Sequence, residues 1–338
     1  MLTVREATAA DNAALLSLVQ TGTGGAIDRG PDFFARLRLY EGTKTYVAEK
    51  DGNIVGAVSR VLKKMHVNGG EYLASYLFDI DYHKPVYDEA LLERCRQEDD
   101  AAGAAFSYLQ LLTGNPRFSS RFTPWDFAEA ARTWLTVLKP APADERLLSG
   151  ARAATPDDYP AIADLMNYCY RDYDYYTPVT AAELAKLVVL PGYAAANLYV
   201  TPANGTINAC LGFLDYRHIY LFFNYSRGAR PGRASTPLYY HLPWLPQPDA
   251  PWNGIVPFPL AYRNSVEELL PLWQLYIRFT AERQLMGLCR FDQNDPLRAL
   301  TQHEAAALTS SPMPLLIRQY DGAPPPQGRL VYVDQRDL

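Results

Sequence analysis

Residues 4–11 read VREATAAD, and residues 151–158 read ARAATPDD. An arginine, an alanine, a threonine and an aspartate recur at matching positions of the two stretches. In each, a short β-strand leads to a threonine that can cap a helix, and the aspartate three residues later can accept the N–H of that threonine. Leucine, isoleucine and alanine then follow at the spacing of one helical face. The repeat predicts two related units, each of which opens with a strand and a capped helix.

Later signals recur in the same order. The pairs Asp51-Gly52 and Asn204-Gly205 each lie between apolar stretches, and such pairs favour tight hairpins because both turn residues tolerate positive φ. Each copy then continues with a helix and a strand, predicted over residues 87–103 and 105–112 and again over 265–284 and 287–291. Strand, helix, hairpin, central strand, helix and strand therefore follow one another twice.

The length of 338 residues suits two domains. A stretch rich in proline and alanine, residues 139–145, predicts the linker between them. We therefore expect an N-terminal domain over residues 1–140 and a C-terminal domain over 146–338. Residues 224–252 insert many prolines and aromatic residues into the second domain, either as a structural plug or as an aromatic lid over a groove.

Composition argues against several classes of function. The formal net charge of −5 disfavours a nucleic-acid-binding surface. The four cysteines form no Cys-x-x-Cys pair and the five histidines no His-x-x-x-His pair, so no metal site is predicted. No signal peptide and no apolar stretch of 18 residues is found, which predicts a cytoplasmic protein that makes no membrane contact. The sequence predicts no particular oligomeric state.

The order of these segments resembles the GNAT superfamily of acetyl-CoA-dependent N-acyltransferases. The segments that carry the likeness are VREATAADNAALLSLV (4–19), YVAEKDGNIVGAVS (46–59), YLASYLFDIDYHKP (72–85) and FSYLQLLTGNP (106–116). The likeness covers nearly the whole chain, twice, and is similar to the tandem architecture of mycothiol synthase, which has one catalytic and one non-catalytic half. It implies an α+β or α/β fold of two GNAT-like domains, each a mixed, mostly antiparallel twisted sheet flanked by helices.

In this family, a glycine-containing loop and the helix after it hold the pyrophosphate of acetyl-CoA through backbone N–H groups. The matching segments here, residues 81–90 and 261–269, contain no glycine. In the first, Pro85 removes a donor, and Asp88 and Glu89 add negative charge. The resemblance therefore implies a donor loop that has lost part of its usual chemistry in both copies.

The second loop keeps more of that chemistry, because Arg263 can pair with phosphate and Ser265 can cap a helix, although Glu267 and Glu268 oppose an anion. The resemblance places the cofactor-binding residues there: Tyr262, Arg263, Asn264, Ser265 and Val266.

The resemblance also implies that an amine attacks the thioester directly, while a carboxylate removes its proton and a tyrosine protonates the leaving thiolate. On the predicted strand over residues 76–82, regular alternation places Asp79 and Asp81 on one face. Asp79, Asp81 and Tyr82 are therefore the catalytic candidates. The alternative is that the two acids pair with arginine or backbone N–H groups, since a buried unpaired carboxylate is costly.

Tyrosines crowd residues 168–176. They can cage an amine, or they can cover helix ends and domain interfaces. The sequence therefore predicts an N-acetyltransferase that takes acetyl-CoA and a small-molecule amine acceptor. Two alternatives remain: a non-catalytic GNAT-like binding or scaffold protein with degenerate CoA loops, and a transferase that uses another donor.

Overall fold

The computed structural model describes residues 1–21, 27–28, 30–82, 86–111, 119–190, 192–193, 197–203, 205–219, 222–223, 254–302, 307–320 and 329–337. Spatial contacts group the chain into two units. Unit 1 comprises residues 1–63, 73–109 and 216–253, and unit 2 comprises 64–72, 110–215 and 254–338. This grouping is discontinuous along the chain, whereas the sequence-based bounds of 1–140 and 146–338 are continuous, and those bounds stay a prediction.

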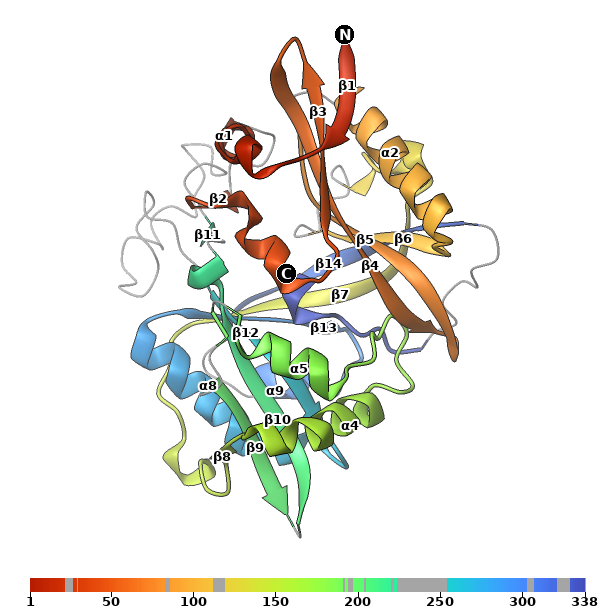
Figure 1. Ribbon diagram of the computed structural model, residues 1–338. Coiled ribbons are helices and arrows are strands. Elements are labelled where there is room, and N and C mark those ends of the chain that lie inside the picture. Colours follow the sequence, from red (N-terminus) through yellow and green to blue (C-terminus); the bar gives the residue numbers. More distant parts are fainter. Residues whose placement is uncertain are drawn as a thin grey trace. The chain divides into compact units, whose positions relative to one another are not determined.

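The sheet of unit 1 runs in the order β1-β3-β4-β5-β6 (Figure 1). Its strands are β1 (Leu2–Glu6), β3 (Lys44–Lys50), β4 (Asn53–Val67), β5 (Gly70–Tyr82) and β6 (Phe106–Gln110). Strand β3 pairs antiparallel with β1 and β4, whereas β5 and β6 run parallel and are paired from Ala74↔Phe106 to Tyr76↔Tyr108. The sheet is therefore mixed, and its parallel pair is short.

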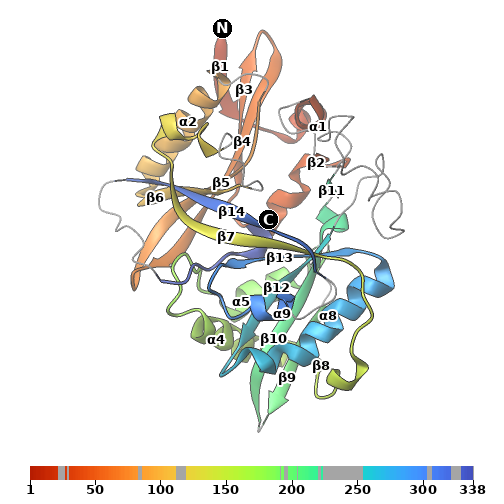
Figure 2. The ribbon, with the colours of Figure 1, turned by 180° about the vertical axis from the view of Figure 1, so that it is seen from behind.

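Helices lie on both sides of this sheet (Figures 1 and 2). They are α1 (Asn12–Thr21), the 3-10 helix η2 (Phe33–Leu39) and α2 (Val86–Ala102). Leu15 and Leu18 of α1 pack in one buried cluster with Val47 of β3. On the opposite side, Arg94 of α2 lies over the ring of Tyr46, the neighbour of Val47. Short strands β2 (Ile27–Asp28) and β11 (Phe222–Phe223) pair separately.

The sheet of unit 2 runs in the order β14-β7-β13-β12-β10-β9-β8. Its strands are β7 (Ala128–Leu138), β8 (Arg152–Ala153), β9 (Leu198–Ala203), β10 (Thr206–Asp215), β12 (Gly254–Tyr262), β13 (Met286–Asp292) and β14 (Ala307–Gln319). Strands β12 and β13 are parallel, and the other pairs are antiparallel. Strand β7, which precedes the predicted linker, thus lies between β13 and β14.

Helices again cover both faces of the sheet (Figures 1 and 2). Helices α4 (Tyr159–Cys169) and α5 (Ala181–Leu187) cover one face, and α8 (Leu270–Arg283) covers the other, with α9 (Arg298–Gln302) following β13. Both units are mixed, mostly antiparallel sheets flanked by helices, which confirms the predicted fold class. Among the described residues, no helix is both long and apolar enough to cross a membrane.

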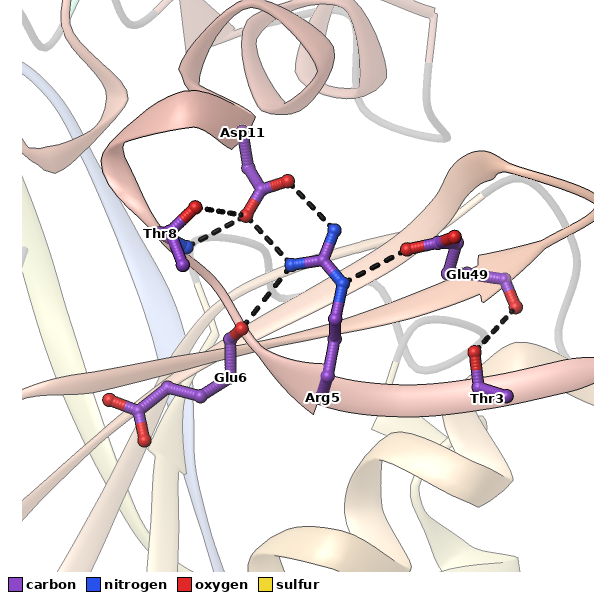
Figure 3. A network of polar contacts seen from close by, with 6 residues as sticks. All are labelled: Thr3, Arg5, Glu6, Thr8, Asp11 and Glu49. Atoms are coloured by element: carbon purple, nitrogen blue, oxygen red, sulfur yellow. Dashed lines mark hydrogen bonds and ion pairs between the residues drawn. The ribbon is translucent and has the colours of Figure 1, made fainter.

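The sequence repeat corresponds to two nearly identical polar clasps. Figure 3 shows the first, in which the Arg5 guanidinium donates to both carboxylate oxygens of Asp11 at 2.8 Å, while Asp11 accepts the N–H of Thr8 at 2.7 Å. In the second, Arg152 donates to Asp158 at 2.7 and 2.8 Å. The capping boxes at η1 (Ala9–Asp11) and η5 (Pro156–Asp158) confirm the predicted helix starts.

The predicted hairpins and helices also occur. Asp51 and Gly52 adopt φ of 52° and 78° between β3 and β4, as a tight turn between these strands requires. Strands β9 and β10 form the second hairpin, in which Gly205 has φ 77°, while Asn204 is outside the described residues. Helix α2 matches its predicted range to within a residue, whereas α8 begins five residues after the predicted start, because the first turn is the 3-10 helix over Val266–Leu269.

Candidate active site

Strand β5 has an irregular backbone at Asp79, the first predicted catalytic residue. Asp79 adopts φ 54°, in the left-handed region, so regular alternation does not continue through it. Before it, alternation holds, because the rings of Tyr76 and Phe78 stack with centroids 4.9 Å apart and planes 12° apart. A non-glycine residue with positive φ inside a strand redirects the side chains that follow. The regular two-faced pattern predicted for residues 76–82 is therefore wrong from Asp79 onward.

The Asp79 carboxylate is in a buried ion pair. Its Oδ1 accepts from Nη1 of Arg36 at 2.7 Å, and the two side chains are 0% and 7% exposed. Burial opposes the charge of Arg36, but the neighbouring Asp79 carboxylate outweighs it and raises the arginine pKa. Asp79 thus has the charged partner that the structural alternative anticipates, and its catalytic role stays a prediction.

Aromatic rings surround a second buried cation beside this pair. The Lys63 ammonium lies 4.5 Å from the ring centroid of Tyr40 and 4.9 Å from that of Tyr76, and Arg36 lies 5.2 Å from that of Phe78. Such contacts stabilise a cation that has lost water. We call Arg36, Tyr40, Lys63, Tyr76, Phe78 and Asp79 the β5 cluster; it is a buried, charged and aromatic cluster within unit 1.

The remaining candidates of the first copy lie at the end of β5. Asp81 is half-buried, unlike Asp79. The backbone of Tyr82 ends the strand, but its side chain is outside the described part, as are residues 83–85. The two aspartates are therefore not an equivalent pair, and Asp81 is the more accessible of the two for proton transfer.

The start of α2 differs from expectation. Asp88 is buried, and its Oδ1 has no hydrogen-bond partner among the described residues. Burial raises the pKa of Asp88 to about 8. Burial thus favours the neutral form of Asp88, against the negative charge that the sequence predicts for it, whereas Glu89 is exposed.

The second predicted loop joins β12 to η8 (Val266–Leu269). Tyr262 ends β12 and is half-buried, Ser265 is the N-cap residue, and Val266 opens η8. Between them, the backbone N–H groups of Arg263 and Asn264 both donate to Glu268 Oε2, at 3.1 and 3.0 Å. The N–H of Arg263 also donates to the Asn208 carbonyl at 2.9 Å, so groups of the chain itself accept from both donors.

Beyond the short parallel pairing of β12 and β13 in unit 2, side chains of the same unit bond to the backbone of these two strands. Strands β12 and β13 are registered only at Gly254↔Met286 and Ile255↔Gly287. Beyond that, the Gln335 amide pairs with the backbone N–H and C=O of Arg290 at 2.9 and 2.5 Å, and the Tyr170 hydroxyl donates to the Leu260 carbonyl at 2.5 Å. The cavity that remains among these residues has room for about one water molecule.

The tyrosines of residues 168–176 belong to the core of unit 2. Tyr170, Tyr173, Tyr175 and Tyr176 are buried, and Tyr168 is 41% exposed. The rings of Tyr170 and Tyr176 pack edge-on or tilted against each other and against Tyr332. These four side chains are packing groups, as the structural alternative for this segment anticipates. The insertion 224–252 lies outside the described residues.

Sequence reasoning missed Arg36 and Lys63. Arg36 lies 43 residues from Asp79, and no motif links these positions. Glu268 was recognised as an acid near the loop, but not as the group that binds the loop. Within the described part of the chain, no cluster of His, Cys, Asp and Glu suited to a metal ion occurs.

Solved structures provide the comparison. A conserved protein from Enterococcus faecalis V583, a probable N-acyltransferase, matches with TM-score 0.56 and 11% identity over 94% of this chain and 73% of its own. A GCN5-related N-acetyltransferase from Kribbella flavida matches with TM-score 0.55 and 12% identity over 95% and 71%.

The chain has the GNAT fold. Saccharomyces cerevisiae N-myristoyltransferase with bound myristoyl-CoA also matches, with TM-score 0.64 and 10% identity over 96% of this chain and 80% of that one. No protein-family profile matches the sequence, and no curated protein does either. The likeness to GNAT-fold proteins is therefore a likeness of fold.

Proposed function

We propose that this GNAT-fold protein is an N-acyltransferase that moves an acyl group from an acyl-CoA, acetyl-CoA in the first instance, to a small amine. The observation that carries the proposal is the left-handed backbone of Asp79 within β5, surrounded by the β5 cluster. Residues held in sparsely populated backbone regions cluster at active sites, where the surrounding structure compensates the strain. The yeast N-myristoyltransferase, a match in fold that holds myristoyl-CoA, supports the donor class.

The reaction is a direct transfer. The amine nitrogen attacks the thioester carbonyl, an amide bond forms, the carbon–sulfur bond breaks, and CoA leaves as a thiolate. Asp79 and Asp81 are the candidates to accept the amine proton, and Tyr82 is the candidate to protonate the thiolate. Because Arg36 compensates Asp79, Asp81 is the favoured base.

Within unit 2 taken by itself, we propose the loop Tyr262–Val266 for the donor pyrophosphate, because backbone N–H groups of that loop bind a carboxylate of the chain. Asp79, Asp81 and Tyr82 belong to unit 1 and are candidates for that unit alone. Arg263 would add a guanidinium there. CoA supplies the activated acyl carbon when bound, and the protein supplies position and charge.

A transfer assay tests the proposal. Release of free CoA from acetyl-CoA is followed with a thiol reagent over a panel of small amines. We expect amine-dependent release, a loss of kcat in Asp81→Asn of about 10²–10⁴-fold, and an unchanged rate in the control Asp172→Asn, an acid whose side chain is 78% exposed. Equal rates for the two variants would reject Asp81 as the base.

A second candidate is a GNAT-fold binding protein without catalysis. The contact of Glu268 with the donor loop favours it, because an anionic ligand must compete with that carboxylate. Tight CoA binding without release of CoA from acetyl-CoA, over the whole amine panel, would favour this second function.

A further inference from the structure

Asp295 is a buried acid in the turn that follows β13 in unit 2. The residue is 6% exposed, and it borders the small cavity beside β12 and β13 that has room for about one water molecule. Its carboxyl group accepts the backbone N–H of Leu297 at 2.8 Å and is hydrogen-bonded to the side chain of Tyr173. Two neutral donors thus face this group, one from its own turn and one from the segment after α4.

The other titratable groups around Asp295 are acidic or neutral. Asp292, at the end of β13, is 7% exposed and accepts two backbone N–H groups. The remaining groups are a thiol and three phenols: Cys169, Tyr170, Tyr262 and Tyr332. Arg298, the nearest arginine along the chain, donates from Nη1 to the backbone carbonyl of Gln293 at 2.5 Å. Within the described part of the chain, no basic side chain compensates a charge on Asp295.

The surroundings of Asp295 place its change of charge close to neutral pH. An ionised carboxylate is costly in a protein interior when no cation accompanies it. Burial raises the pKa of Asp295 to about 7. The Leu297 N–H and the Tyr173 side chain lower this pKa, whereas the charge of Asp292 raises it. Loss of the proton therefore puts an uncompensated negative charge at the wall of the cavity.

The strands beside this carboxyl group have little backbone pairing that would oppose the entry of water. Strands β12 and β13 are registered only at Gly254↔Met286 and Ile255↔Gly287, and both contribute residues to the cavity wall farther along. Water that enters there hydrates the charge and removes most of its cost. The geometry thus links the charge of Asp295 to the opening of this region.

We propose that Asp295 is a pH-sensitive latch of unit 2: its neutral carboxyl group keeps the region between β12 and the turn after β13 closed, and loss of the proton opens that region to water. The latch goes beyond the proposed function, because it requires neither an acyl donor nor an acceptor. Its sign follows from linkage. The closed form holds the proton up to a higher pH than the open form, so opening increases as pH rises from about 4 to about 7 and then levels off.

Hydrogen exchange of the intact chain, measured by mass spectrometry and normalised to the chemical exchange rate at each pH, tests the latch. Opening of residues 257–262 and 291–297 should increase at least about tenfold between pH 5 and pH 7, since one proton contributes up to about tenfold per pH unit. Strand β9, which pairs with β8 and β10, should not change. In Asp295→Asn the increase should be absent. No increase in the wild type, or an equal increase in Asp295→Asn, would overturn the proposal.

Three further variants separate the latch from a general loss of packing. Asp292→Asn removes the like charge, so opening should level off at a lower pH than in the wild type. Tyr173→Phe removes a donor to the carboxyl group, so opening should level off at a higher pH. Asp88→Asn, which changes a buried acid of unit 1, should leave the exchange of these segments unchanged. Shifts of the first two variants in one direction, or no shift in either, would also overturn the proposal.

Discussion

The ion pair between Arg36 and Asp79 makes a quantitative prediction about unit 1. Asp79→Asn leaves a guanidinium that is 7% exposed without its carboxylate, and Arg36→Met leaves a carboxylate that is 0% exposed without its cation. A buried charge that has lost its partner pays a desolvation cost with no compensating attraction. Each single variant should therefore lose about 3–5 kcal/mol of unfolding free energy.

The double variant isolates the interaction energy between Arg36 and Asp79 from the effects of each substitution alone. Arg36→Met with Asp79→Leu removes both charges and keeps apolar volume beside Phe78, and such replacements of buried pairs are often neutral. Its loss should be at least about 2 kcal/mol smaller than the sum of the two single losses, which corresponds to more than tenfold in the folding equilibrium.

Unfolding in guanidinium chloride, followed by far-UV circular dichroism, measures the unfolding free energies of the two single variants and the double variant relative to the wild type. Acyl transfer by the same variants is measured below their melting temperatures. One result would refute the structural role of Asp79. In it, Asp79→Asn loses less than about 1 kcal/mol of unfolding free energy and shows no coupling to Arg36, yet abolishes acyl transfer. That result would make Asp79 a catalytic base.

Three further predictions concern single acids. Asp11→Asn and Asp158→Asn should each lose about 1 kcal/mol in denaturant unfolding, because each removes a cap and a clasp; a large inequality between them would contradict the equivalence of the two clasps. In both, arginine lowers the aspartate pKa, so their contribution is present above the ordinary value of 3.8 and fades as pH falls below it, which melting curves from pH 2 to 6 should show. Asp88, whose pKa burial raises to about 8, should instead cost stability as pH rises from about 4 to 8; Asp88→Asn should flatten that decline in Tm, and an unchanged slope would count against a buried protonated Asp88.

Local signals were predictable because their physics involves residues close together in the chain. The capping boxes depend on Thr8 and Asp11, or on Thr155 and Asp158, three positions apart, and the hairpin at Asp51 depends on adjacent residues. The recurrence of an arginine six residues before each aspartate was visible, but the bidentate clasp that it forms appeared only in the structure.

The candidate site was less predictable because its contacts span long separations. The prediction of alternation along β5 assumes a regular strand, and the left-handed conformation of Asp79 breaks that assumption. The sequence gives no sign of this conformation, because the residue is not a glycine. The partner of Asp79 comes from η2, and a second cation, Lys63, comes from β4. At the second loop, the sequence showed that Glu268 brings negative charge, but whether that charge repels a ligand or binds the loop depends on the fold of the turn.

Titration calorimetry of the intact chain with acetyl-CoA and with free CoA tests the central claim most directly. The proposed acyl-CoA-dependent transferase predicts saturable binding of both ligands with a dissociation constant between about 1 μM and 1 mM, weakened by Arg263→Ala. Absence of binding at millimolar concentrations of both ligands would contradict the claim that this GNAT-fold protein uses an acyl-CoA donor.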